Sequence, residues 1–284
     1  MDAIGNKKRP EWLKKKINLA ECSELHRLFG QLDLNTVCKE AHCPNISECF
    51  SAKVATFLIL GNICTRNCRF CAVKKGRPQP LDNDEPRRLA EAVKKLGLKH
   101  VVITSVTRDD LPDGGSEAFV QNILALKSMD ADIKVEVLVP DFQGNIDSIK
   151  QVVQSGCDIF AHNIETVPEL YTQVRSDSNY CRSLEVLKIA KEINSSVYTK
   201  SGIMLGLGEL EEQVLGVLKD MRQVGCDFLS IGQYLSPSKK HYQVKDFIHP
   251  DKFIFYKQKA LELGFAHVES GSYVRSSYRA SDYL

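Results

Sequence analysis

The sequence has few of the features that mark membrane or nucleic-acid-binding proteins. No run approaches the roughly 18 uninterrupted apolar residues of a membrane-spanning helix, and the Lys-rich start lacks the apolar stretch of a secretion signal. The net charge is only +2, from 38 Lys and Arg against 36 Asp and Glu, which is too small for binding nucleic acid through overall charge. We therefore expect a cytoplasmic protein that binds neither membranes nor nucleic acid.

Cysteine is the residue that the chain has in excess. There are ten cysteines in 284 residues, and a reducing compartment disfavours a disulfide framework, so metal binding or redox chemistry is the leading explanation. Six of them form two triplets, which are Cys38, Cys43 and Cys49 in CKEAHCPNISECF and Cys64, Cys68 and Cys71 in CTRNCRFC. Cys157 and Cys226 each follow a glycine at the expected end of a helix, where we expect small buried residues.

The pattern of apolar residues predicts parallel βα units. With 43% hydrophobic residues the chain can bury one core of barrel size. Short β-branched runs alternate with stretches of helical period, such as 116–128 and 210–224. The predicted strands are 54–60, 100–105, 133–139, 158–163, 197–203 and 227–233. We therefore expect an α/β fold, a partial (β/α)6 TIM-like barrel over 51–235, with extensions at 1–50 and 236–284 that lack the βα rhythm and pack across it.

The second triplet can hold a cluster with an open position. Three thiolates within eight residues can bind three irons of a [4Fe–4S] cluster and leave the fourth iron to a ligand from outside the protein. A closed zinc site usually takes four ligands as two pairs, which neither triplet offers. A purely structural zinc or iron–sulfur site remains the alternative, but such a site has no use for an open iron.

CTRNCRFC, directly after the first strand of a predicted barrel, resembles the motif of the radical S-adenosylmethionine (SAM) enzymes. The resemblance implies that the open iron chelates SAM and that one electron splits SAM into methionine and a 5′-deoxyadenosyl radical. In this reading Cys64, Cys68 and Cys71 bind the first cluster.

Further motifs resemble the lipoyl synthase family from about residue 10 to 281. They are CKEAHCPNISECF, GNICTRNCRFCAVKKGRP, VVITSVTRDDLPDGG, HNIETVPELY, KSGIMLGLGE and VRSSYRA. The resemblance implies a second, auxiliary [4Fe–4S] cluster on Cys38, Cys43, Cys49 and Ser277, and an enzyme that inserts sulfur at C6 and C8 of a protein-bound octanoyl-lysine. It implies that the auxiliary cluster is consumed as sulfur donor. We expect Ser277 to be a labile ligand, because a hard oxygen matches iron less well than a thiolate.

The resemblance also implies partners. The substrate would be an octanoylated lipoyl-domain or glycine-cleavage carrier protein, and the enzyme would need a low-potential electron donor and an iron–sulfur delivery protein. The basic segments Lys7–Arg9 and Lys14–Lys16 could dock an acidic carrier or form an ordinary solvated face.

Four residues resemble positions that hold SAM in the superfamily: Ser105, Asn163, Glu165 and Arg175. Their types suit the task, since carboxylates accept from amino and hydroxyl groups and Arg pairs with carboxylates. For Glu165 and Arg175 a structural ion pair is the alternative.

Two loops near these positions leave the sequence reading open. Gly206 and Gly208 allow either a close approach to adenine or an ordinary turn. Unlike the family pattern, which has Pro-Gly, Arg175 is followed here by Ser176, Asp177 and Ser178.

Two other functions share some of these features. Another radical SAM enzyme with an auxiliary cluster would share CTRNCRFC, but it has no reason to combine RSSY with C-x4-C-x5-C. A non-catalytic carrier of two clusters would need neither an open iron nor a rim of polar residues at the strand ends. The terminal RSSYRA discriminates best among the three.

Overall fold

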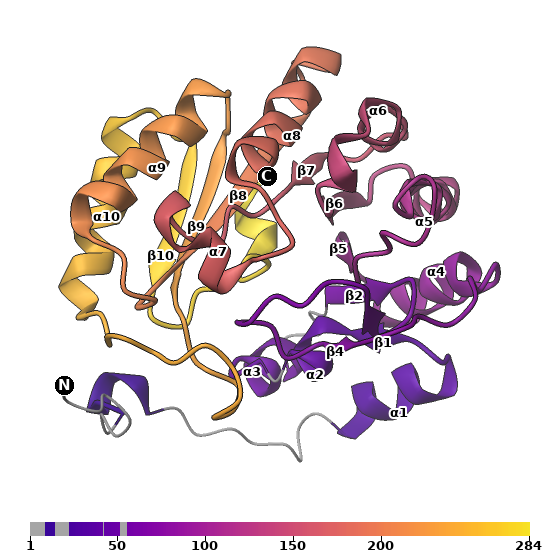
Figure 1. Cartoon of the computed structure of the whole chain (residues 1–284). Coiled ribbons are helices and arrows are strands. Elements are labelled where there is room, and N and C mark those ends of the chain that lie inside the picture. Colours follow the sequence, from indigo (N-terminus) through magenta and orange to yellow (C-terminus); the bar gives the residue numbers. More distant parts are fainter. Residues whose placement is uncertain (1–8, 15–22, 42, 52–55) are drawn as a thin grey trace.

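The computed structural model describes residues 9–14, 23–41, 43–51 and 56–284, and among these no helix has the length and apolarity needed to cross a membrane. Its centre is a curved eight-stranded sheet in the order β1-β2-β5-β6-β7-β8-β9-β10 (Figure 1). All neighbours are parallel except β1, which pairs antiparallel with β2 at one edge. The expected α/β partial barrel is confirmed.

The six predicted strands are all present, with bounds within two residues or so of those expected. They are β2 (Thr56–Ile59), β5 (His100–Ser105), β6 (Lys134–Leu138), β7 (Ile159–Ala161), β8 (Tyr198–Leu205) and β9 (Phe228–Gln233). Their outward residues are packed under helices, which is why they read as continuous apolar runs.

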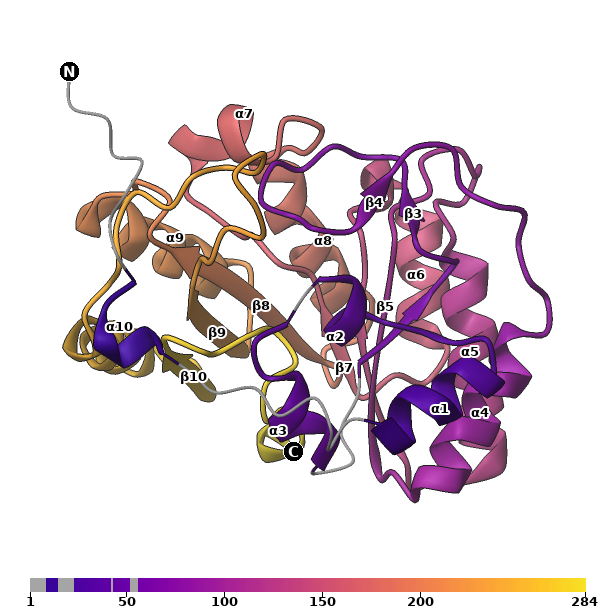
Figure 2. The same cartoon turned by 90° about the horizontal axis from the view of Figure 1, so that it is seen from below.

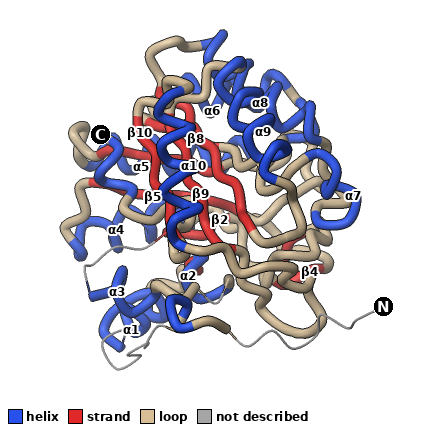
Figure 3. The backbone as a smooth tube through the Cα atoms, turned by 90° about the vertical axis from the view of Figure 1, so that its left-hand side faces the viewer, coloured by secondary structure: helices blue, strands red, loops and turns tan. Residues whose placement is uncertain are grey.

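Helices cover the outer face of the sheet (Figure 3). They are α4 (Glu85–Leu96), α5 (Ser116–Met129), α6 (Ile146–Gln154), α8 (Tyr180–Ile193), α9 (Glu211–Gln223) and α10 (Pro250–Glu262). The predicted helical stretch 116–128 corresponds to α5, whose Phe119, Ile123 and Leu126 are fully buried. α4 ends at Gly97, whose φ of 65° is the left-handed conformation that glycine adopts most easily.

The C-terminal extension differs from the expectation. Residues 236–284 continue the βα rhythm by one unit, because α10 leads into β10 (His267–Gly271), which pairs parallel with β9. The strand is hard to recognise because polar His267 and Glu269 alternate along it with Val268. The chain then ends in the short turn η5 (Ala280–Tyr283).

The N-terminal extension borders the other edge of the sheet. It contributes η1 (Glu11–Leu13), α1 (Ser23–Gln31), β1 (Asn35–Thr36), α2 (Val37–Glu40) and α3 (Ile46–Ser51). Figure 2 shows α3 beside the C-terminal segment, and Tyr278 donates a hydrogen bond to Glu48 of α3 at 3.1 Å. The two ends of the chain therefore meet where the partial barrel is open.

Candidate active site

A cavity of about 570 Å³ lies inside the barrel at the carboxyl ends of the strands. It is lined by residues from both cysteine triplets and from the strand ends that the sequence singled out. The sequence-predicted residues among them are Cys38, Cys43, Cys64, Cys68, Cys71, Ser105, Asn163, Glu165, Arg175 and Ser277. Residues that are as far apart as 38 and 277 in the chain therefore face one space.

The triplet of Cys64, Cys68 and Cys71 lies on a loop that is held in place at both ends. Cys64 ends β3 (Ile63–Cys64), and the loop returns through β4 (Lys74–Lys75), which pairs with β3 in a small parallel sheet. Backbone N–H groups of Arg66 and Thr107 lie 3.4 Å from the Cys64 sulfur. Burial raises the pKa of Cys71 to about 12, so its thiolate form needs a bound cation such as iron.

An arginine inside this loop, which sequence reasoning missed, fastens it to the barrel. Arg66 donates to both oxygens of Asp109 at 2.7 and 2.8 Å and to Asp141 at 2.5 Å. The pKa of Asp141 would be raised by burial, but the hydrogen bond and charge of Arg66 lower it to about 2. The position of Arg66 between two cysteines was the only sign in the sequence of such a role. Its partners could not be predicted, because they follow 43 and 75 residues later in the chain.

The residues that follow Arg175 contact the same loop. The Asp177 carboxylate accepts from the backbone N–H of Asn67 at 2.7 Å, and Arg66 donates to the Ser178 hydroxyl at 3.4 Å. The departure from the Pro-Gly pattern thus supplies two polar contacts to the cysteine loop.

Arg175 supports the polypeptide that carries Asn163. Its Nη1 donates to the carbonyl oxygens of Asn163 and Ile164 at 2.8 and 3.1 Å. Asn163 in turn donates to Glu165 at 3.1 Å, and burial raises the pKa of the Glu165 carboxyl. The guanidinium therefore braces backbone carbonyls, and Glu165 faces the cavity with Asn163 as its hydrogen-bond donor.

Gly206 and Gly208 do not line the cavity. A Cβ on Gly206 would lie 2.3 Å from the Gln233 amide nitrogen and 2.4 Å from the Asp246 carbonyl oxygen. The close approach at this glycine is made by the protein itself, so the turn reading holds for Gly206.

The triplet of Cys38, Cys43 and Cys49 lies beside the C-terminal RSSY segment. A small cavity of about 20 Å³ is lined by Cys38, Cys43, Cys49, Ser277 and their neighbours Asn45, Thr56, Arg275 and Tyr278. Short helical turns space the cysteines, since the N–H of Cys43 donates to Cys38 and that of Cys49 to Asn45. Burial raises the pKa of Cys38 to about 12.

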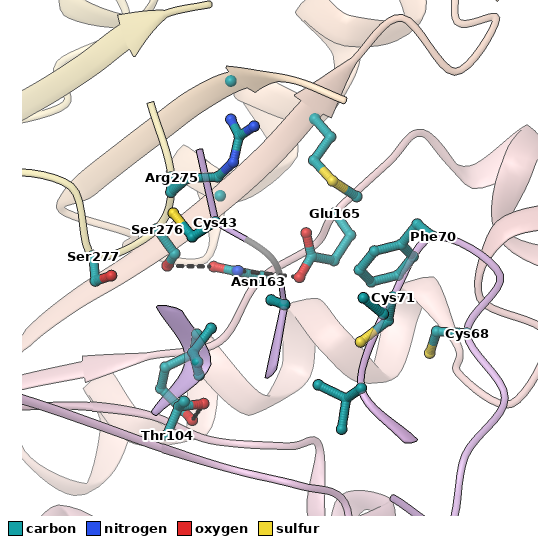
Figure 4. A pocket seen from close by; sticks show the side chains of 18 of the residues that line it. Cys43, Cys68, Phe70, Cys71, Thr104, Asn163, Glu165, Arg275, Ser276 and Ser277 are labelled. Atoms are coloured by element: carbon teal, nitrogen blue, oxygen red, sulfur yellow. Dashed lines mark hydrogen bonds between the residues drawn. The ribbon is translucent and has the colours of Figure 1, made fainter. Parts of the chain in front are cut away.

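Besides the bond from Tyr278 to Glu48, three hydrogen bonds tie the RSSY segment to its surroundings, and sequence reasoning did not foresee them. Thr56 donates to the Ser277 hydroxyl at 2.7 Å, Asn45 donates to the Tyr273 carbonyl at 2.7 Å, and Ser276 donates to Asn163 at 3.1 Å. Figure 4 shows that the line from Ser276 through Asn163 to Glu165 crosses the cavity between Cys43 on one side and Cys71 on the other. These three hydrogen-bonded side chains thus lie between the two cysteine sites and form the polar connection between them.

The donor set fits iron–sulfur clusters and a polar ligand. Each site offers three sulfur atoms, which are the usual ligands of such clusters. No three Cys, His, Asp or Glu side chains of the described residues converge as ligands of a single ion, and in a cluster each thiolate binds a different iron. Within the described part of the chain the Ser105 hydroxyl is buried without a hydrogen-bond partner, which suits a polar molecule in the cavity.

Other predictions about cysteines and basic residues have mixed outcomes. Cys157 and Cys226 are buried, as expected. Lys7, Lys8, Lys15 and Lys16 lie outside the described residues. Arg9 lines the cavity, whereas Lys14 pairs with Glu11.

Comparison with known proteins agrees with this geometry. The sequence profile of the radical SAM superfamily matches residues 58–221. The chain is 54% identical to lipoyl synthase of Caldanaerobacter subterraneus subsp. tengcongensis over 96% of both chains, and 56% identical to lipoyl synthase of Caldicellulosiruptor saccharolyticus over 97% of both. The chain belongs to the lipoyl synthase family.

Solved structures support the fold. SuiB of Streptococcus suis bound to S-adenosylmethionine superimposes with a TM-score of 0.59 at 13% identity, covering 88% of this chain and 60% of that one. Methylornithine synthase gives a TM-score of 0.55 at 15% identity, covering 75% of this chain and 70% of that one. As a radical SAM enzyme of the lipoyl synthase family, the chain uses SAM and [4Fe–4S] chemistry to insert sulfur.

Proposed function

We propose that this enzyme inserts sulfur at C6 and C8 of an octanoyl-lysine borne by a carrier protein, using two [4Fe–4S] clusters. The observation that carries the proposal is the placement of Cys38, Cys43, Cys49 and Ser277 around one small cavity next to the SAM-site cavity. An enzyme that only cleaved SAM would need no second set of soft ligands. Family membership supports the same conclusion.

The residues divide between two sites. Cys64, Cys68 and Cys71 hold the cluster that chelates SAM, with Ser105, Asn163, Glu165 and Arg175 around SAM. Cys38, Cys43, Cys49 and Ser277 hold the auxiliary cluster. When bound, the first cluster with SAM supplies the radical that removes hydrogen from unactivated carbons, and the auxiliary cluster supplies the sulfur.

The protein's own groups prepare this chemistry. Arg66 holds the first cysteine loop against Asp109 and Asp141, while Arg175 fixes the backbone of Asn163. The cavity lies inside the barrel, so a substrate chain that enters it would be partly shielded from bulk water. Segments 1–50 and 236–284 supply the four proposed ligands of the auxiliary cluster, and 51–235 supplies the three cysteines of the SAM-binding cluster.

Ser277 is the labile ligand. The Thr56 hydroxyl donates to the Ser277 oxygen at 2.7 Å, so a donor would be in place to stabilise that oxygen if it were released from an iron that it held. Replacing Ser277 with cysteine is expected to slow sulfur insertion, because a thiolate holds iron more firmly. A Ser277→Cys enzyme that completes both insertions at the native rate would contradict this role.

The substrate carrier is an octanoylated lipoyl domain or glycine-cleavage carrier protein, with a low-potential electron donor and an iron–sulfur delivery protein as further partners. The support is family membership and a basic side chain in the lining of the cavity, Arg9.

An anaerobic single-turnover assay tests the function. The enzyme is mixed with SAM, a low-potential reductant and an octanoyl-lysine peptide, and 5′-deoxyadenosine and peptide mass are followed together. We expect a gain of two sulfurs. Cys38→Ala should keep SAM cleavage but lose sulfur transfer, whereas Cys68→Ala should lose both. SAM cleavage without any gain of sulfur by wild type would favour another radical SAM reaction.

A further inference from the structure

The last turn of the chain fills the floor of the barrel. Figure 2 shows the carboxyl terminus at the end of the barrel that lies away from β3, β4 and α7 (Tyr171–Val174). We propose that this turn, η5, anchors the segment that carries Ser277, and that Tyr283 is its positioning residue. The inference rests on the proposed auxiliary site, to which Ser277 belongs.

Tyr283 sits in an aromatic seat made by the first residues of two neighbouring strands. Its ring centroid lies 5.3 Å from that of Phe228 on β9 and 4.4 Å from that of His267 on β10. Tyr283 is only 6% exposed. These two ring contacts fix the position of its side chain.

A buried cation completes the seat. Lys200 Nζ lies 3.8 Å from the centroid of the Tyr283 ring and 3.0 Å from each carboxylate oxygen of Glu136. Both charged side chains are fully buried inside the barrel. A cation–π contact is strongest when the cation is desolvated, so the Lys200 ammonium holds the ring more firmly than a surface lysine would.

The seat matters because the cluster ligand lies on an irregular segment between two fixed points. Residues 272–279 form no helix or strand and connect β10, which is paired in the sheet, to η5. Ser277 lies six residues before Tyr283. Since the segment is held at both ends, placing Ser277 beside the three cysteines costs less conformational entropy than placing it on a free tail would.

Apart from Val274, which is buried close to β10, the segment is held by single hydrogen bonds. Thr56, Asn45, Asn163 and Glu48 contribute one each. One neutral hydrogen bond contributes little by itself against the entropy of ordering several residues. The apolar and cationic seat of Tyr283 is therefore the main lower anchor of the segment.

The test compares Tyr283→Ala with two controls. Tyr283→Phe keeps the ring and should behave as wild type. Tyr198→Ala removes a half-exposed ring that stacks on the same Phe228 at 4.9 Å but does not belong to the segment. After anaerobic reconstitution we expect about eight irons per chain in wild type and both controls, and about four in Tyr283→Ala.

Two further readouts distinguish positioning from general destabilisation. Tyr283→Ala should still cleave SAM to 5′-deoxyadenosine. In the metal-free proteins, hydrogen exchange should be faster in residues 272–279 of Tyr283→Ala and unchanged in α4. Should Tyr283→Ala fail to fold, Tyr283→Leu gives the same comparison, because leucine fills part of the seat without the cation–π contact.

Three outcomes overturn the inference. They are full iron loading of Tyr283→Ala with wild-type exchange in 272–279, equal loss of both clusters, and exchange that is faster in α4 as well. A wild-type enzyme that binds only about four irons contradicts the proposed auxiliary cluster instead, and the exchange measurement then still decides whether Tyr283 anchors the segment.

Discussion

Replacing Arg66 with alanine removes the main counter-charge of a buried carboxylate. The Arg66 side chain is 5% exposed and that of Asp141 is fully buried, and the two are joined at 2.5 Å. Breaking a buried ion pair by removing one partner costs about 3–5 kcal/mol, because the other charge stays buried. Since Arg182 remains at 3.5 Å from Asp141, we expect a loss of about 3 kcal/mol in the free energy of unfolding at pH 7.

The effect must depend on pH in a defined direction. In wild type the pKa of Asp141 falls from 3.8 to about 2, which at about 1.4 kcal/mol per pKa unit is about 2 kcal/mol of stability. This contribution is complete above an unfolded pKa of about 4 and is lost as the pH falls towards 2. In Arg66→Ala, burial favours the neutral form of the Asp141 carboxyl. Protonation of Asp141 at mildly acidic pH therefore removes the buried charge and stabilises the variant. The stability difference between the two proteins therefore shrinks as the pH is lowered from 7 to 4.

Urea unfolding of the metal-free proteins at pH 7, 5 and 4 measures this difference. Arg182→Ala is the matched control, because Arg182 reaches the same carboxylate from a side chain that is 39% exposed and should contribute less than about 1 kcal/mol. The reasoning is refuted if Arg66→Ala costs no more than Arg182→Ala at pH 7, or if the difference from wild type is the same at every pH.

Two further substitutions probe the barrel floor and the polar connection between the sites. Lys200→Met leaves Glu136 buried without its counter-charge and should lower the free energy of unfolding, measured by chemical denaturation, by about 3–5 kcal/mol. The double variant with Glu136→Leu should recover most of that loss. A double variant as unstable as the single one would contradict the buried-pair argument. Ser276→Ala removes the hydrogen bond to Asn163 at 3.1 Å, which is worth about 1 kcal/mol, so the dissociation constant for SAM should rise about fivefold. Calorimetric titration of the reconstituted enzyme checks this, and an unchanged constant would exclude a role for Ser276 in SAM binding.

Local patterns predicted the parts of the molecule that depend on nearby residues. The spacing of Cys64, Cys68 and Cys71 places three thiols on one loop, and the βα rhythm predicted strands that the structure contains. β10 was not predicted because its inward residues, His267 and Glu269, are polar, which hides the apolar alternation.

Long-range contacts were beyond such patterns. The partners of Arg66 and the donor to Ser277 depend on which strands are neighbours, and no periodicity encodes that. Asp109 and Asp141 follow the predicted strands in the sequence. Only the structure shows that both carboxylates bind the same Arg66 guanidinium and so act together. For the same reason the sequence left open whether Gly206 faces a ligand or the protein's own chain.

Thiol count, spacing and motif order are properties of the linear chain, so the radical SAM and iron–sulfur character of the protein could be predicted without its fold. How the two cysteine sites are assembled follows only from the folded chain. It brings Ser277 from the end of the chain to the cysteines at its beginning, across the open side of a partial barrel, and it buries Tyr283 on the Lys200–Glu136 pair. The physical reason is that sheet closure and burial are set by all the strands together, so contacts between residues about 240 positions apart exist only once the whole barrel has formed.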